Sequence, residues 1–286
     1  MILACALLAV LACGSPEAVA DASAESTPVA ESAASDAPGD AAEVEATRAR
    51  RAARKAATKE AMAMLQAMSD FLAAQESLRF EADIAYDSVQ RTGHKLEFGG
   101  TRSMVLRRPD RLRIEAERRN GEASTLTFDG QHLAIDLADE EAYVRVEAPG
   151  SVDEMVDYLV LELGVPMPLA DLIHSNLYGE VADQIDAALY VEDSRLGERW
   201  CRHLAFSGAT ADLQLWIEEG DRPVPCRIVL TYKHEPGSPQ FSANLRNWDF
   251  TAATPDDLFA FSPAEGAERI SIRAAAAQAQ ESREVN

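Results

Sequence analysis

The sequence is poor in cysteine and in positive charge. Four cysteines in 286 residues are too few for a small scaffold held together by disulfides. Only 27 lysines and arginines face 48 aspartates and glutamates, so the net charge is −21. Such an acidic chain disfavours broad contact with nucleic acid or anionic lipid. No apolar run reaches the roughly 20 residues of a membrane-spanning helix, and a hydrophobic content of 47% is that of a globular protein.

The sequence also lacks the motifs of the common enzyme classes. It contains no G-x-S-x-G, no H-E-x-x-H, no Walker loop and no G-x-G-x-x-G. None of the five histidines has a nucleophile in a recognisable arrangement. Cys201, His203 and Cys226 could be read as metal ligands, but a second pair at fixed spacing is missing. We therefore expect no enzymatic activity, no cofactor and no metal site.

The N-terminal residues resemble a targeting signal. Residues 1–13, MILACALLAVLAC, are uncharged and too short to span a bilayer, as in the apolar part of a secretory signal. Their end, with small residues before Cys13, resembles the lipobox of bacterial lipoproteins. We predict a signal peptide over 1–12, lipid attachment at Cys13 and a periplasmic location at the outer membrane. A plain cleaved signal with a chance cysteine is the alternative.

An acidic linker is expected next. Residues 13–57 are rich in Ala, Glu, Ser and Asp and contain no aromatic residue, so they cannot bury enough apolar surface to offset the entropy of ordering. We predict a disordered tether there, ending in a basic stretch over 48–59 that is either a membrane contact or a solvated helix start. The folded domain is expected over 58–273, followed by a disordered tail over 274–286.

The sequence pattern predicts a domain made mainly of β-strands. A helix over 58–75 is predicted by one apolar stripe, and strands with one apolar face alternate with turns from 78 to 146 and again from 187 to 262. Between the two runs, 151–186 has helical spacing and begins with a capping box, Ser151 to Glu154. The prediction is an α+β fold: an unclosed antiparallel half-barrel of about eleven strands with an N-terminal helix and a helical lid.

Several stretches carry a family resemblance. They are LQA at 65–67, VLRRPDRL at 105–112, TFDGQHL at 127–133 and LFAFSP at 258–263. These are similar to the bacterial outer-membrane lipoprotein carrier and receptor family (LolA/LolB-like). QLWIE at 214–218 and DRPVP at 221–225 resemble, more closely, a family of predicted periplasmic proteins of unknown function. The resemblance implies an open barrel with a helical lid over an apolar cavity.

One arginine is singled out by that resemblance. In the carrier, the second of the two basic residues before the proline holds the lid by hydrogen bonds, and the matching residue is Arg108. Its strand parity, shared with Met104 and Leu106, also points it inward. A solvated position at the rim of the sheet is the alternative for Arg108, and the favoured one for Arg102. The receptor's apolar protruding loop has no counterpart, because 118–122 is polar.

The predicted binding site is the apolar interior of the half-barrel. Its expected lining, from strands and lid, is Phe80, Ile84, Leu96, Phe98, Met104, Leu106, Leu112, Ile114, Leu126, Phe128, Leu159 and Leu163. We expect this interior to hold an acyl chain, a lipid or a lipoprotein, with membrane contact only through the lipid anchor. The alternative is a regulatory module of the same fold that binds an envelope protein and has a self-filled interior.

Cys201 and Cys226 form the last candidate pair. An oxidising periplasm permits a disulfide, although a flat three-stranded meander would hold the two residues about 9 to 10 Å apart. The loop over 219–225 can bring Cys226 across before strand pairing begins. We therefore predict a disulfide between them.

Overall fold

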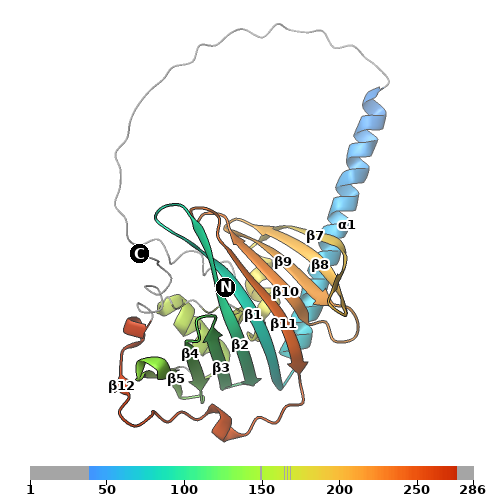
Figure 1. Ribbon diagram of the computed structural model, residues 1–286. Helices are drawn as coiled ribbons and strands as arrows, with labels where there is room; N and C mark the ends of the chain where they lie inside the picture. Colours follow the sequence, from blue (N-terminus) through green and yellow to red (C-terminus); the bar gives the residue numbers. More distant parts are fainter. Residues whose placement is uncertain (1–38, 149, 164, 166, 168, 276–286) are drawn as a thin grey trace.

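The fold is built on one curved sheet of 12 strands. The computed structural model describes residues 39–148, 150–163, 165, 167 and 169–275 (Figure 1). The strands are β1 (Ser77–Val89), β2 (Lys95–Arg107), β3 (Arg111–Arg118), β4 (Ala123–Phe128), β5 (His132–Leu137), β6 (Ala142–Glu147), β7 (Ile185–Leu196), β8 (Arg199–Gly208), β9 (Ala211–Glu218), β10 (Pro225–Tyr232), β11 (Gln240–Asp249) and β12 (Glu268–Arg269).

Two antiparallel meanders meet in the middle of this sheet. The strand order is β12-β6-β5-β4-β3-β2-β1-β11-β10-β9-β8-β7, so β1 joins the first meander to the second by pairing with β11. The outermost strands, β12 and β7, have no common partner, and the sheet stays open. The predicted half-barrel with an N-terminal helix and an inserted helical segment is confirmed.

The neighbouring strands come unusually close to the backbone of β2 at two glycines. Gly99 and Gly100 lie in the middle of this strand and are buried. A Cβ atom on Gly99 would lie 2.3 Å from the carbonyl oxygen of Ile84, and one on Gly100 would lie 2.1 Å from that of Glu117. Only residues without a side chain allow the neighbouring strands to come so near.

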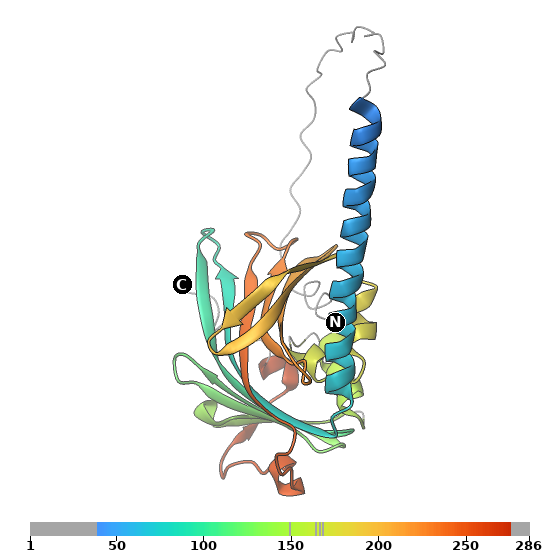
Figure 2. The same cartoon turned by 90° about the vertical axis from the view of Figure 1, so that its right-hand side faces the viewer.

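The N-terminal helix is longer than the sequence predicted. α1 runs over Gly39–Ala73, about 52 Å at 1.5 Å per residue, and its first half projects beyond the sheet (Figure 2). The expectation of a disordered linker up to residue 57 is therefore wrong for residues 39–57. The side chains of residues 45–49, 52, 55 and 56 are exposed, and the stretch is rich in alanine and arginine, which have high intrinsic helix propensity. The signal peptide, Cys13 and the rest of the linker lie outside the described residues.

The second half of α1 packs against β7 and the segment between β6 and β7. Leu65, Met68 and Leu72 are each 1% exposed, on the apolar stripe predicted from the spacing. The Thr58 hydroxyl donates to the carbonyl oxygen of Ala188 in β7 at 3.0 Å. The amide of Tyr178 donates to the hydroxyl of buried Ser69 at 3.0 Å, which fastens the inserted segment to α1.

The segment between β6 and β7 forms a lid of short helical turns. It comprises α2 (Val152–Asp157), the π-helical turn η2 (Tyr158–Glu162), the 3-10 turn η3 (Ala170–Leu172) and α3 (Leu177–Ala182). The predicted capping box is present at Ser151 and Glu154. Four side chains of the lid are buried in the same core as β1 and β2, so the lid covers part of the concave side of the sheet: Val152, Met155, Val156 and Leu159.

The chain after β11 wraps the outer side of the sheet. The strand predicted over 258–262 is wrong, because Asp256–Phe259 form a 3-10 turn, η4, after Pro255. The guanidinium of Arg107 donates to the carboxylate of Asp256 and lies over the ring of Phe259, which is 1% exposed.

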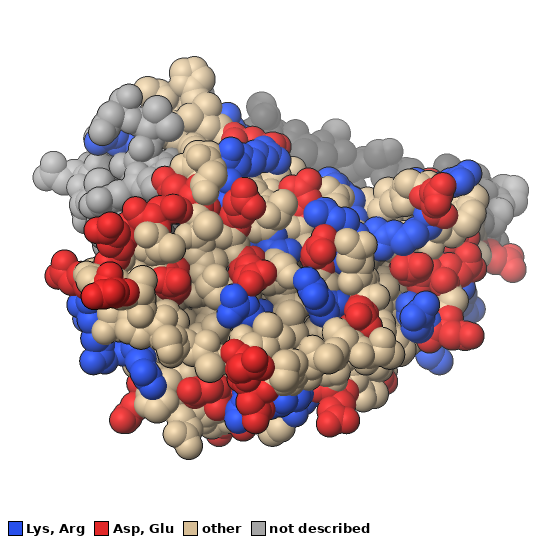
Figure 3. Space-filling view, turned by 60° about the horizontal axis from the view of Figure 1, so that its bottom comes forward, with Lys and Arg blue, Asp and Glu red and all other residues tan. Residues whose placement is uncertain are grey.

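On the described surface seen in Figure 3, acidic and basic side chains are interspersed and form no broad basic patch.

The predicted disulfide between Cys201 and Cys226 is present, with Cα atoms 6.8 Å apart. Cys201 lies opposite Glu218, the last residue of β9, and Cys226 lies at a register shift at the start of β10. The intervening strand ends at this point, so β8 and β10 can approach each other. The two thiols are therefore not available to a metal.

No helix among the described residues is long and apolar enough to cross a membrane.

Candidate ligand-binding pocket

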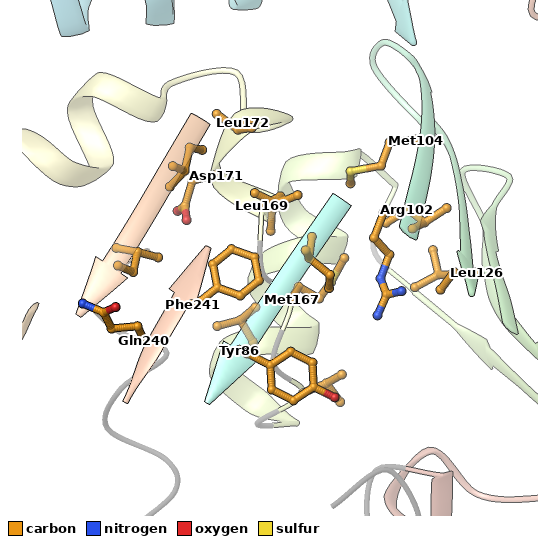
Figure 4. A pocket seen from close by; sticks show the side chains of 18 of the residues that line it. Tyr86, Arg102, Met104, Leu126, Met167, Leu169, Asp171, Leu172, Gln240 and Phe241 are labelled. Atoms are coloured by element: carbon orange, nitrogen blue, oxygen red, sulfur yellow. The ribbon is translucent and has the colours of Figure 1, made fainter. Parts of the chain in front are cut away.

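A pocket of about 390 Å³ lies between the concave face of the sheet and the lid. Its walls come from β1 to β5 on one side, from β10 and β11 on the other, and from Val160, Val165, Met167 and residues 169–172 of the lid. Figure 4 shows Phe241, Met167 and Leu169 among its apolar side chains. The helical turns of the lid thus leave part of the concave face uncovered.

The predicted lining residues divide into two groups. Ile84, Met104, Ile114 and Leu126 border the pocket. The structure places the others away from its wall: in the packed core are Phe80, Leu106, Leu112, Phe128 and Leu159, each 0% exposed. Leu163 packs against that core from the lid. Leu96 is 37% exposed and Phe98 is half-buried near the start of β2.

The second wall was not included in the sequence prediction. It consists of inward-facing residues of the second meander and of the lid: Ile228, Leu230, Tyr232, Phe241, Val165 and Met167. The alternation of Ile228, Leu230 and Tyr232 in the predicted strand 225–233 is the same signal that identified β2 and β3. It could have found this wall once the two meanders were known to face each other.

Arg102 lies on the wall of the pocket. It is half-buried and borders the pocket, where Figure 4 shows it and Asp171 on opposite sides of the apolar side chains. One of its nitrogens, Nη1, donates to the carbonyl oxygen of Thr101 at 2.8 Å. The pocket therefore contains charged groups within an otherwise apolar wall.

Arg108 points inward, as its parity predicted. Its Nε and Nη2 atoms are buried and have no hydrogen-bond partner among the described residues. Burial lowers the pKa of this guanidinium, and the negative charge of Asp153 in α2 opposes that effect. Among the described residues, Asp153 is the lid group whose charge acts on Arg108.

The lid helix is fastened beside this arginine. The amide of Val152 donates to the carbonyl oxygen of Pro109 at 2.8 Å. Asp153 in turn accepts a hydrogen bond from the amide of Ser175 at 3.0 Å and another from its hydroxyl. One end of the lid is thus tied to the turn between β2 and β3, and the same end is held to residues that follow η3.

The histidines and acids show no metal site within the described chain. No group of three or more His, Cys, Asp or Glu side chains there could hold a metal ion. His203 instead stacks on Trp216, with ring centroids 4.0 Å apart, and is within hydrogen-bond distance of Gln214. Because Cys201 and Cys226 are bonded to each other, the metal-ligand alternative for these three residues is wrong.

The chain belongs to a family of predicted periplasmic proteins, DUF2092, whose model matches residues 61–273. The resemblance stated from the sequence is thereby confirmed. A search of the curated proteins finds no match. The location predicted for the family is the periplasm.

Solved structures with a similar course of the chain include two mycobacterial proteins and one from Nitrosomonas. LprF from Mycobacterium bovis is 12% identical, with a TM-score of 0.44 over 68% of this chain and 95% of LprF. Lipoprotein LppX from Mycobacterium tuberculosis is 8% identical, with a TM-score of 0.44 over 68% of this chain and 98% of LppX. A LolA superfamily protein from Nitrosomonas europaea is 11% identical, with a TM-score of 0.35 over 70% and 97%.

Proposed function

We propose that this protein is a non-enzymatic periplasmic binding protein that holds the apolar chain of an amphiphile, such as an acyl chain of a lipid or lipoprotein, between its sheet and its lid. The observation that supports this function is the pocket of about 390 Å³ that the side chains of the described residues leave unfilled. A pocket of this size is within the range of small-molecule sites, roughly 300 to 1,000 Å³.

Burial of apolar surface drives binding in this proposal. The apolar surface of the ligand that leaves water contributes about 25 cal/mol of binding free energy per Å². Apolar contacts come from Met104, Leu126 and Phe241 of the sheet and from Met167 of the lid. The ligand enters when the lid moves. Arg108 attracts Asp153 and so favours the closed lid, which is the role proposed for it from the sequence.

Attachment to a membrane is a separate part of the proposal. Lipid on Cys13 would hold the chain at the outer membrane, and the residues between Cys13 and α1 would separate the pocket from the bilayer. Metabolic labelling with a radioactive fatty acid tests this part. Label that is absent from a Cys13→Ala variant and present in the native chain is the expected result, and equal label in both contradicts the anchor.

The pocket itself is tested by filling it. Ala116 borders the pocket on the inner face of β3, and the next residue, Glu117, is exposed on the opposite face because side chains alternate along a strand. We expect Ala116→Trp to abolish binding of a neutral apolar dye such as N-phenyl-1-naphthylamine. Glu117→Trp is the matched control and should bind the dye like the native chain. Equal binding by both variants would exclude this pocket as the site.

A protein partner is the second candidate function. Three large apolar side chains are exposed at one edge of the sheet: Leu189 at 50% and Val191 at 42% on the edge strand β7, and Trp200 at 54% on the neighbouring strand β8. Exposed apolar groups near a sheet edge favour contact with another protein. A photoreactive residue in place of Trp200 should then cross-link to an envelope protein in cells, and the absence of any cross-linked protein would remove this candidate.

A further inference from the structure

Four charged side chains border the pocket, and three of them are acidic: Asp87, Asp171 and Glu235, against Arg102. The charge of Asp87 is matched within the protein. Its carboxylate pairs with Lys95 at 2.9 Å and accepts a hydrogen bond from the amide of Gln240 at 2.9 Å. This acid is therefore part of the structure that joins β1 to the start of β11.

Glu235 has no such partner. It lies in the turn between β10 and β11 and is half-buried, and no described residue forms a hydrogen bond or an ion pair with its carboxylate. Burial raises the pKa of this carboxyl above its ordinary value. A carboxylate that loses water without gaining a partner costs free energy, and a positive charge placed beside it would recover that cost.

The charged groups around the pocket also favour a positively charged ligand. Apart from the pair formed by Asp87 and Lys95, the charged groups among the described lining residues are the carboxylates of Asp171 and Glu235 and the guanidinium of Arg102, a formal charge of −1. Asp171 is only 5% exposed, so solvent screens its charge poorly. A concave site with apolar walls strengthens the field of the charges that line it. The pocket should therefore prefer a cationic headgroup to an anionic one.

We propose that the ligand of this pocket is an amphiphile whose headgroup carries an ammonium group, and that Glu235 binds this group at the pocket wall. The inference rests on the proposed function, because it assigns a headgroup to the ligand whose apolar chain the pocket holds. A free fatty acid would add a further negative charge to a lining that already carries the carboxylates of Asp171 and Glu235, and it is disfavoured.

Three amphiphiles of one chain length test the proposal: dodecyltrimethylammonium, neutral dodecyl maltoside and dodecanoate. Each displaces the neutral dye from the full chain at pH 7.5, below the concentration at which it forms micelles. We expect the ammonium compound to bind at least about fivefold more tightly than the maltoside, the effect of one moderately screened ion pair, and dodecanoate to bind most weakly.

Two variants then assign the preference to one residue. Glu235→Gln should lose the fivefold preference for the ammonium compound and leave the affinity for dodecyl maltoside unchanged. Glu265→Gln is the matched control, because Glu265 is exposed, does not border the pocket and changes the net charge by the same amount. This variant should bind all three amphiphiles like the native chain.

The outcomes separate this inference from the function on which it rests. Binding of dodecanoate as tight as that of the ammonium compound overturns the cationic headgroup and leaves the proposed function standing. A preference for ammonium that persists in Glu235→Gln, or that falls equally in Glu265→Gln, overturns the role of Glu235. If neither the dye nor any of the three amphiphiles binds, both proposals fall.

Discussion

Removal of the Cys201–Cys226 disulfide should destabilise the domain strongly. The bond closes a loop with a sequence separation of 25 residues. In the chain-entropy description, a crosslink over a loop of this length removes about 12 cal/mol/K from the unfolded chain, or about 3.5 kcal/mol at 25 °C. Both cysteines are 1% exposed, so a Cys201→Ala/Cys226→Ala variant loses this contribution and some core packing as well.

Thermal unfolding followed by circular dichroism measures the effect. For a domain of this size, about 1 kcal/mol changes the Tm by about 2 to 4 °C, so the double variant should melt about 7 to 14 °C below the oxidised native chain. The native chain with a reducing agent is the control and should melt close to the double variant. A Tm that is unchanged in both samples would refute the assignment of a stabilising crosslink between β8 and β10.

Three further predictions concern the lid, the pocket acid and the helix. Arg108→Leu removes the attraction to Asp153 and should raise amide hydrogen exchange over 151–175, whereas unchanged exchange would exclude a role in holding the lid. The raised pKa of Glu235 means that the folded chain holds this proton more tightly than the unfolded chain, so its effect on stability becomes unfavourable as pH rises above about 4.5. Glu235→Gln should accordingly raise the Tm at pH 7, with a gain that fades as pH falls below that value, and an equal gain at both pH values would contradict the assignment. Deletion of residues 39–55 should shift the Tm by less than about 2 °C because this half of α1 projects from the domain, and a larger fall would show that it packs against the rest.

The sequence predicted which side of each strand faces inward. Alternation placed Met104 and Leu106 of β2, and Arg108 directly after it, on one face, and the structure buries all or part of each of these side chains. Parity succeeds because it depends only on the period of a strand. The capping box at Ser151 was predictable because it depends only on residues three apart in the sequence.

The sequence could not separate the pocket from the core. Phe128 and Leu126 share a strand and a face, yet the first is fully buried and the second borders the pocket. The difference arises from how far the lid reaches across the sheet, which depends on packing between segments distant in the sequence. The prediction for residues 39–57 was wrong for a different reason. The helix there depends on the intrinsic propensity of its residues, and the sequence has no apolar periodicity in this stretch from which it could be recognised.

Native mass spectrometry of the chain purified from the periplasm without detergent tests most directly whether a ligand lies between the sheet and the lid. We predict one bound amphiphile per chain in the native protein and in Glu117→Trp, and none in Ala116→Trp. The bare mass for all three, or an equal adduct on all three, would contradict a binding site between the sheet and the lid.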